Sequence, residues 1–559
     1  MARSPLIRLL RRAYKVAQVS RKRQIPRAEV LGMLQEKASR RRLLQASLGF
    51  AGAVAANRLT QGPRAAVAQS GIEPVLIVGA GISGLTAAYR LATAGVPVNI
   101  IEARNQVGGR MRSLPKAAGT AITAELGGEF INTDHTCLRN LAEELGFNVL
   151  DVEAAQQGLN RESYFFEGRL ISEEELIRDF APVAQQINAD LEILENFEDY
   201  TTADQPTIDL DRLSITEYLD RIPTTPVVRQ IVRIAYNVEY GRDPEEQSSL
   251  NLIFLIGAEP GEFELLGISD ERFYIDGGNQ QVPRQLAELL ASSVEVGTVL
   301  ESISSTANGR YRVSMRAGQS TFDRIYERVL LALPFTVLRT IPLNVDLPPV
   351  KRLAIDTLGY GTNAKLITAY REPIWRSRYN SNGRVLSDLG FQNIWESTQG
   401  VFTASGGSRL ITNFTGGRHG VLLGSATPQA HAQTLLPQLE QVFPGISSLA
   451  IPGKEIRAYW PGELYNQGSY SCYLPGQWTQ MYGSEGERVG NLFFAGEHTS
   501  VECQGFMEGG CETGEATALE ILQDLGLQAP AAQQRERLQN SRSQRINPRS
   551  PRPFQRFRR

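Results

Sequence analysis

The feature that most constrains the fold is a glycine-rich turn between an apolar run and a helical pattern, in residues 74–103. The turn and the start of the helix contain Gly79, Gly81, Ile82, Ser83 and Gly84. In a G-x-G-x-x-G turn the first glycine allows a tight bend, the second lets the backbone approach a pyrophosphate, and the third lets helix and strand pack closely. The N–H groups at the helix start then face the phosphates. Glu102 ends a second apolar strand, where it can bind ribose hydroxyls. This order predicts an α/β fold with a doubly wound, Rossmann-like dinucleotide-binding domain.

The next residues favour a flavin over a nicotinamide. EARNQVGGRMRS, residues 102–113, resembles the second fingerprint of the flavin amine oxidase family, in which a GGR turn places an arginine on the FAD pyrophosphate. The resemblance implies this role for Arg110, and a guanidinium suits a diphosphate because it offers a rigid fork of donors. It also implies FAD contacts by Ala103, Arg104 and Gly109.

The resemblance covers roughly residues 69–527 and points to the monoamine oxidase and L-amino-acid oxidase branch, as an exported bacterial member. AELGGEFINTDHTCLRNLAEELGF, from 124, looks like the segment whose glycines pass the flavin ring, and VEVGTVLESI, from 294, is similar to the strand whose valine touches the adenine. NLFFAGEHTSVECQGFMEGGCETGEATALEIL, 491–522, is close to the monoamine oxidase ending, where a glutamate reaches the ribityl region and a helix start faces the flavin. The cofactor residues implied are Gly127, Gly128, Val299, Glu497, Phe506 and Met507.

The same resemblance implies two domains: an FAD domain assembled from three chain segments, and a substrate domain of mixed sheet and helices. Residues 150–265 resemble the family least and show amphipathic helical patterns that we expect to cap the substrate cavity. The expected boundaries are 1–68 for an export signal, 69–149, 269–345 and 487–527 for the FAD domain, 150–268 (helical) and 346–486 for the substrate domain, and 528–559 for a basic disordered tail.

Four residues are candidates for the chemistry by resemblance. Lys365 lies in the strand-like run GTNAKLITAY, where it either sits at a strand edge or, as in the family, holds a water against flavin N5. Trp460, Tyr470 and Phe506 fall where the family places aromatic residues beside the flavin. Two such rings offer an amine a π surface and a dry slot.

The chain departs from its relatives at two places. Ser469 stands where monoamine oxidases carry the cysteine bonded to the flavin, so we expect FAD to be held noncovalently. Gly127, Gly128, Glu129 and Phe130 stand where better-known L-amino-acid oxidases place an arginine for the substrate carboxylate. Glu129 instead offers a negative charge near the flavin, or pairs with a buried arginine.

The implied reaction is oxidation of an amine to an imine by transfer of a hydride equivalent to the flavin, followed by hydrolysis. Oxygen, which gives hydrogen peroxide, or a quinone is the expected electron acceptor. The substrate is a basic L-amino acid such as arginine or lysine, which we favour because exported bacterial relatives often act on amino acids, or a primary amine or polyamine. A desaturase of isoprenoid or pigment substrates and a redox-inactive scaffold are more distant alternatives.

The N-terminus predicts export. Residues 39–56, SRRRLLQASLGFAGAVAA, hold an apolar run too short for the roughly 20 residues of a membrane-spanning helix. A basic region, a short apolar region and the AVA at 66–68 have the order of a cleaved signal, with cleavage after Ala68. Residues 39–44 resemble a twin-arginine signal, which implies recognition by that export machinery and a periplasmic or secreted protein. A basic helix lying on a surface is the alternative.

Charge and composition limit the classes of partner that we expect this protein to bind. The first 68 residues carry 15 Lys and Arg against two acids, and residues 528–559 carry nine Arg against one acid, so the intervening body has a net charge near −23. Such a body repels nucleic acid and attracts cations. The four cysteines and four histidines have no metal-site spacing, so we expect free thiols and no metal. We expect no transmembrane segment in the mature protein. A homodimer is one assembly that the sequence allows.

Overall fold

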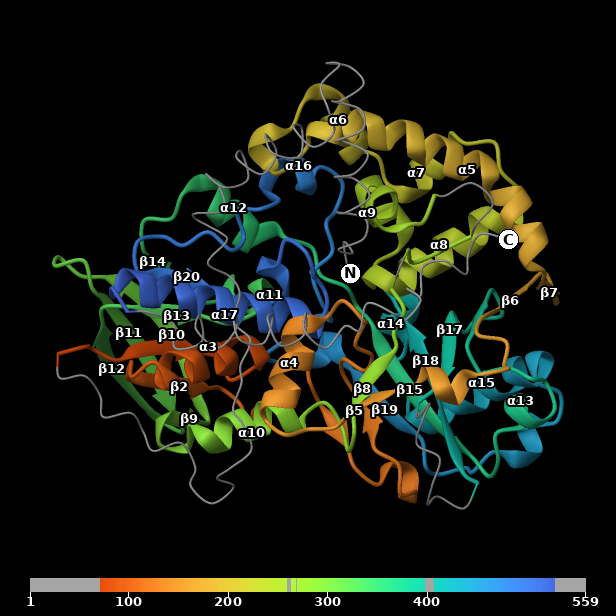
Figure 1. The fold of residues 1–559 in the computed structure, drawn as a ribbon, viewed down its shortest axis with the longest axis horizontal. Coiled ribbons are helices and arrows are strands. Elements are labelled where there is room, and N and C mark those ends of the chain that lie inside the picture. The colour runs from red at the N-terminus through yellow and green to blue at the C-terminus, as the bar shows by residue number, and fades with distance from the viewer. Residues whose placement is uncertain (1–70, 259–262, 268, 398–406, 528–559) are drawn as a thin grey trace, which may run out of the picture.

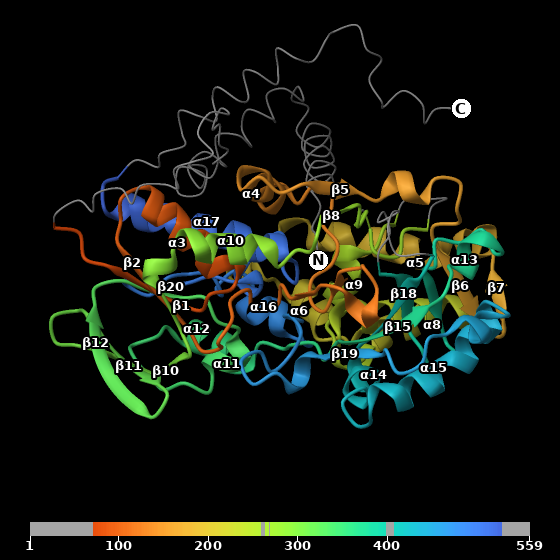
Figure 2. The ribbon, with the colours of Figure 1, turned by 90° about the horizontal axis from the view of Figure 1, so that it is seen from below.

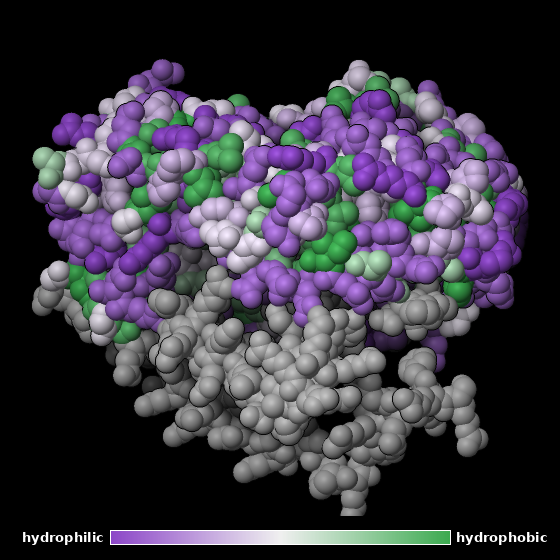
Figure 3. All heavy atoms as spheres, turned by 90° about the horizontal axis from the view of Figure 1, so that it is seen from above, coloured by the Kyte–Doolittle hydropathy of each residue, from purple (hydrophilic) through white to green (hydrophobic). Residues whose placement is uncertain are grey.

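The computed structural model describes residues 71–258, 263–267, 269–397 and 407–527 (Figure 1). The predicted export signal and basic tail lie outside these residues. None of the described helices is long and apolar enough to span a bilayer. Hydrophilic residues surround small apolar patches on the face of the described part that Figure 3 shows.

A parallel five-stranded sheet, ordered β20-β13-β1-β2-β9, forms the centre of what we call the nucleotide region. Parallel neighbours need crossover connections, and here three distant stretches of chain supply the strands. The strands are β1 (Val75–Val78), β2 (Val98–Glu102), β9 (Val294–Val296), β13 (Val329–Leu331) and β20 (Leu492–Phe494).

The two faces of this sheet are covered differently, as Figure 2 shows. Val75 and Ile77 pack with the helices α3 (Ile82–Thr93), α10 (Gln281–Leu289) and α17 (Met507–Asp524). Leu76 and Val78 pack on the opposite face, because side chains alternate along a strand. That face is covered by a four-stranded sheet of β10 (Thr298–Ser305), β11 (Tyr311–Ala317), β12 (Ser320–Tyr326) and β14 (Leu343–Asn344).

A mixed seven-stranded sheet forms the centre of what we call the substrate region. Its order is β19-β15-β18-β17-β16-β6-β7, and only the β16–β6 pair is parallel. The strands are β6 (Ser163–Phe166), β7 (Arg169–Ile171), β15 (Ala364–Tyr370), β16 (Val385–Ser387), β17 (Asn393–Glu396), β18 (Arg409–Thr415) and β19 (Ile456–Tyr459). The stretch 150–268, expected to be helical, therefore also supplies the edge hairpin β6–β7.

Five helices form a layer beside this sheet, in which α8 contacts β6, β16 and β18, and the ends of these helices follow from local sequence. Ser172 accepts a hydrogen bond from Glu175 N at the start of α5, whose first turn is acidic. Thr225 and Pro226 begin α8, and Gly241 ends it in the left-handed region at φ 70°. The helices are α5 (Glu173–Ile193), α6 (Gln205–Asp211), α7 (Ile215–Asp220), α8 (Pro226–Tyr240) and α9 (Ser249–Leu255).

The other elements connect these layers or, as α14 and α15 do, pack on the seven-stranded sheet. Short ladders join β3 (Ser113–Leu114) to β4 (Ala124–Glu125) and β5 (Val149–Asp151) to β8 (Phe273–Ile275). The remaining α-helices are α4 (Thr136–Glu144), α11 (Phe335–Leu338), α12 (Pro349–Thr357), α13 (Ile374–Ser377), α14 (Gly417–Leu422), α15 (Pro428–Val442) and α16 (Gln477–Met481).

Candidate active site

A cavity of ≈ 660 Å³ extends from the glycine turn after β1 to the strands β15, β17 and β18. Of the residues predicted for the site, all but Gly84 line it. The part furthest from the glycine turn, which we call the substrate end, is lined by Glu129, Phe130, Glu239, Glu271, Lys365, Trp395, Phe414 and Tyr470.

The three motif glycines have three different steric roles. A Cβ at Gly84 would lie 2.1 Å from Gly79 O, so this position holds helix and strand together and does not reach the cavity. Gly79 has φ +104°, where an L side chain is strained. A Cβ at Gly81 would meet nothing within 4 Å and lies at the cavity wall, which leaves its backbone open to a ligand.

Two helices begin at the cavity without a side-chain cap. The N-cap residues are Gly81 for α3 and Phe506 for α17, and neither supplies a side-chain hydrogen bond. The first N–H groups of a helix have no partner within the helix, and the dipole there favours negative charge. Both helix starts are therefore suited to an anionic or electron-rich ligand.

Glu102 is oriented by the backbone on both sides. Its Oε2 accepts from Ala80 N at 2.9 Å and its Oε1 accepts from Arg104 N at 2.9 Å. Burial raises the pKa of this carboxyl above its ordinary value. Glu102 lines the cavity at the end of β2, as the fingerprint predicts for a ribose-binding acid.

Arg110 and Glu497 join distant segments beside the cavity. The Arg110 guanidinium donates to Ser469 O at 2.7 Å and to Glu497 Oε1 at 2.8 Å. Ser471 Oγ and Gly505 N also donate to Glu497 Oε2. Burial acts to raise the pKa of Glu497, but Arg110 and these donors hold it below its ordinary value, so the carboxylate stays ionised.

These features fit FAD. Gly81 and Arg110 would hold the diphosphate, Glu102 a ribose, and Val299 the adenine end, while the start of α17 would face the flavin. The cavity also contains a polar group that lacks a protein partner: both ring nitrogens of His498 are buried without a hydrogen bond. Burial lowers the pKa of His498 to about 3, so an uncharged imidazole is left for a ligand.

Lys365 is fixed in the centre of the cavity wall rather than at a strand edge. Its Nζ donates to Glu125 O at 3.0 Å, Gly127 O at 2.9 Å and Glu129 Oε2 at 2.8 Å. An ammonium has three donors, and all three are used within the protein. The expected contact from Lys365 to a water would therefore need one of these bonds to open.

Glu129 pairs with a lysine, not with the buried arginine that the sequence left open. Both side chains are buried, and the pair neutralises the charge that we expected Glu129 to present to a substrate. Burial raises the pKa of Glu129, while Lys365 acts in the opposite direction. Its other oxygen, Oε1, is buried without a hydrogen bond.

The three predicted aromatic residues line the same cavity from different segments. Trp460 Nε1 donates to Leu126 O at 2.9 Å, and the Tyr470 hydroxyl donates to Val238 O at 3.2 Å. The Phe506 ring meets His135 edge-on, with centroids 4.9 Å apart. Burial keeps the pKa of Tyr470 well above its ordinary value, so its hydroxyl remains a neutral donor.

Several residues of the substrate end were missed from the sequence. Trp395 and Phe414 lie on neighbouring strands, with centroids 5.4 Å apart and Lys365 Nζ within 5.9 Å of each. Glu239 follows the last apolar positions of α8, and Glu271 lies before β8. Their spacing in the chain carries no motif, since only the packing of α8 against the sheet brings them together.

Comparison with known proteins agrees with this geometry. A family model described as flavin containing amine oxidoreductase matches residues 82–522. Flavin-containing amine oxidase B of Canis lupus familiaris is 26% identical over 474 residues, which cover 82% of this chain and 87% of the relative. Flavin-containing amine oxidase A of Sus scrofa is 24% identical over 471 residues, covering 81% and 85%.

Solved structures show the same fold. Cyclohexylamine oxidase from Brevibacterium oxydans superposes with a TM-score of 0.69 at 21% identity, over 81% of this chain and 99% of that one. Putrescine oxidase bound to putrescine superposes with a TM-score of 0.68 at 22% identity, over 80% and 99%. From the extent of the family match, the chain belongs to the flavin-containing amine oxidoreductases, enzymes that act on CH–NH₂ groups with FAD.

Proposed function

We propose that this enzyme deaminates a primary amine that carries a second positive charge, a diamine or polyamine. The amine, oxygen and water give an aldehyde, ammonia and hydrogen peroxide. The observation that carries the proposal is the charge at the substrate end. Among the described residues that line this end there are three carboxylates, Glu129, Glu239 and Glu271, and one cation, Lys365. Lys365 pairs with Glu129 and Arg384 pairs with Glu271, which leaves the carboxylate of Glu239 without a cation in the described part of the chain.

FAD, when bound, supplies the redox chemistry by accepting the hydride equivalent. The residues of the chain hold and orient the amine. Tyr470 and Phe506 offer π surface, and with Trp395 they make the cavity wall apolar. Burial in the cavity disfavours a protonated amine, so the reacting nitrogen is held in its neutral form.

A basic L-amino acid, the substrate that the sequence favoured, is the second candidate. The observation in its favour is Arg384, which forms an ion pair with Glu271 and lies 5.8 Å from the Phe130 ring centroid. A substrate carboxylate could replace Glu271 on this guanidinium, since arginine binds carboxylates through a bidentate fork. That exchange would leave Glu271 without its partner, which is why we favour the amine.

Anaerobic reduction of the purified holoenzyme tests the proposal. The oxidised flavin band is followed after adding putrescine, spermidine, benzylamine, L-lysine and L-arginine in turn. Bleaching by putrescine and spermidine is the expected result. Bleaching by the two amino acids alone would overturn the amine assignment, and no bleaching by any of the five would overturn amine oxidation.

Export through the twin-arginine route remains our proposal for the cellular location, supported by the order of charge and apolar residues in 39–68. A chain with Arg41 and Arg42 both changed to lysine should stay in the cytoplasm, while the parent chain should appear in the periplasm with Gln69 as its first residue. Equal distribution of the two chains between the compartments would refute this route.

A further inference from the structure

We propose that Glu239 is the subsite for the second ammonium group of the substrate. This inference rests on the proposed function and assigns its charge recognition to one side chain. Glu239 is half-buried on α8 and lines the cavity. Within the described part of the chain, no hydrogen bond or ion pair holds its carboxylate.

The other two acids of the substrate end are already paired. Glu129 binds Lys365, and Glu271 binds Arg384. An incoming ammonium would have to displace a protein cation from either of them, and breaking a buried pair leaves an uncompensated charge. Glu239 can accept an ammonium without that cost, because its carboxylate has no cation to lose.

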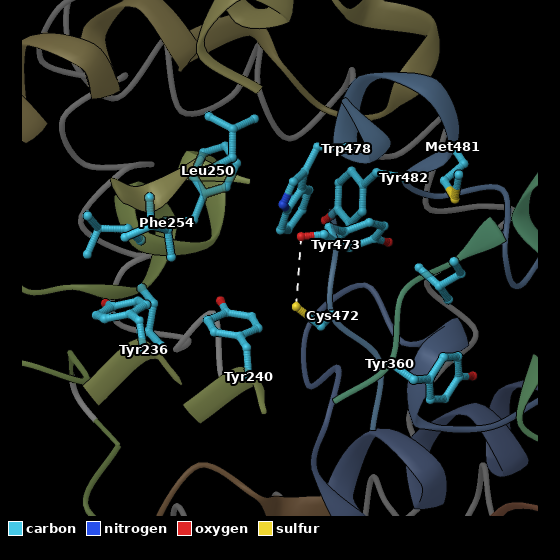
Figure 4. Packing of buried hydrophobic residues seen from close by; sticks show 14 of the residues in the cluster. Tyr236, Tyr240, Leu250, Phe254, Tyr360, Cys472, Tyr473, Trp478, Met481 and Tyr482 are labelled. Carbon is cyan, nitrogen blue, oxygen red and sulfur yellow. Dashed lines mark hydrogen bonds between the residues drawn. The ribbon is translucent and has the colours of Figure 1, made fainter. Parts of the chain in front are cut away.

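The position of Glu239 is fixed by its neighbours on α8. Tyr236 and Tyr240 are buried, and their rings stack with centroids 6.1 Å apart. Figure 4 shows Tyr236 below Phe254 and Tyr240 between Tyr236 and Cys472. The Tyr240 hydroxyl donates to Asn251 O at 3.0 Å, which ties α8 to α9. The helix is therefore a rigid support from which Glu239 projects.

Glu239 also adjoins the predicted aromatic wall. The carbonyl of Val238, one residue earlier, accepts from the Tyr470 hydroxyl at 3.2 Å and from Asn363 Nδ2 at 2.7 Å. A substrate with one amine beside Tyr470 can thus extend its second amine to the carboxylate of the adjoining residue. The chemical class that fits is an alkyl chain with a primary amine at each end.

The surrounding charges support a cation here. Burial, with a smaller contribution from Glu271, raises the pKa of Glu239 to about 7, while Arg384 acts in the opposite direction. A bound ammonium would favour the ionised form, since an opposite charge stabilises a carboxylate. Arg384 is committed to Glu271, so the local field still favours a positive ligand.

The test compares putrescine with n-butylamine, which has the same chain length and lacks the second amine. In the Glu239→Gln holoenzyme we expect the half-saturating putrescine concentration in anaerobic flavin reduction to rise about tenfold or more. The value for n-butylamine should stay within about threefold of the parent enzyme. Glu246→Gln, which removes an exposed acid outside the cavity lining, is the matched control and should leave both values unchanged.

Other outcomes decide against the subsite. Equal losses with both amines would show a structural role for Glu239, and unchanged values with both would show no role. If Glu239→Gln fails to fold, Glu239→Asp replaces it and should weaken putrescine more than n-butylamine. If the parent enzyme is reduced by no amine, the proposed function fails by itself. Calorimetry of putrescine binding to the parent and to Glu239→Gln then tests the subsite. Loss of binding in the variant supports it, and equal binding by both proteins refutes it.

Discussion

The two ends of the cavity are built in different ways. At the nucleotide end, the turn after β1, Glu102 and the start of α3 come from one run of thirty residues, and the backbone N–H groups of Ala80 and Arg104 orient the Glu102 carboxylate. At the substrate end, Glu129, Glu239 and Lys365 come from three distant segments and act through side-chain charge. The phosphates of a cofactor do not vary, so backbone N–H groups in a fixed geometry can bind them. A substrate varies between enzymes, so side chains bind it.

At the nucleotide end, we expect substitutions to act through steric clashes. The largest loss of stability is expected at Gly84. Gly84→Ala puts a Cβ 2.1 Å from Gly79 O, in the packing of helix on strand. We expect a loss of about 4 kcal/mol or more in stability, the range that marks a disrupted core. Soluble yield and the thermal unfolding midpoint measure it.

Gly81→Ala is the control for Gly84→Ala, because it adds the same methyl group in the same turn. Its Cβ meets no protein atom within 4 Å, so the apoprotein should keep its unfolding midpoint while FAD affinity falls about tenfold or more. An apoprotein destabilised as strongly as Gly84→Ala would contradict the separate roles of the two glycines.

At the substrate end, we instead expect substitutions to act by leaving a buried charge without its partner. Lys365→Met leaves Glu129 buried without its partner, and removing one member of a buried pair costs about 3–5 kcal/mol. The thermal midpoint should fall, and flavin reduction by putrescine should slow. Adding Glu129→Gln to Lys365→Met should restore most of the stability without restoring the rate. A double variant as unstable as the single one would show that the pair is not the source of the loss.

The same contrast shows what the sequence could predict. The glycine turn and Glu102 were predicted from the pattern because their geometry depends on neighbours within a short run of chain. The prediction for Arg110 came from the resemblance of its GGR turn to the family fingerprint, and its partners Ser469 and Glu497 are distant in the chain. Lys365 and Glu129 were each identified, but their pairing was not, because 236 residues separate them. Glu239 was missed because an acid on an amphipathic helix is ordinary in sequence, and only the packing of α8 turns it toward the cavity.

A pH effect of intermediate size should appear at the substrate end alone. Burial places the pKa of Glu239 near 7, with Glu271 and Arg384 as its charged neighbours. Below this pH the carboxyl is protonated and cannot pair with an ammonium, and above it the carboxylate can. The efficiency of putrescine relative to n-butylamine should therefore rise roughly tenfold between pH 6 and 8. A ratio that rises equally in Glu239→Gln would assign the titration to another group.

The smallest effect is expected where the aromatic wall meets α8. Tyr470→Phe keeps the ring in the cavity and removes only the hydrogen bond to Val238 O, worth about 1 kcal/mol. We expect less than a threefold change in reduction by n-butylamine, and a similar or slightly larger loss with putrescine, since the carbonyl that is released adjoins Glu239. Tyr470→Leu, which removes the π surface, should slow both amines by about tenfold. If Tyr470→Phe were as slow as Tyr470→Leu, the hydroxyl and not the ring of Tyr470 would be the essential group. The aromatic wall would then act through a hydrogen bond and not through its π surface.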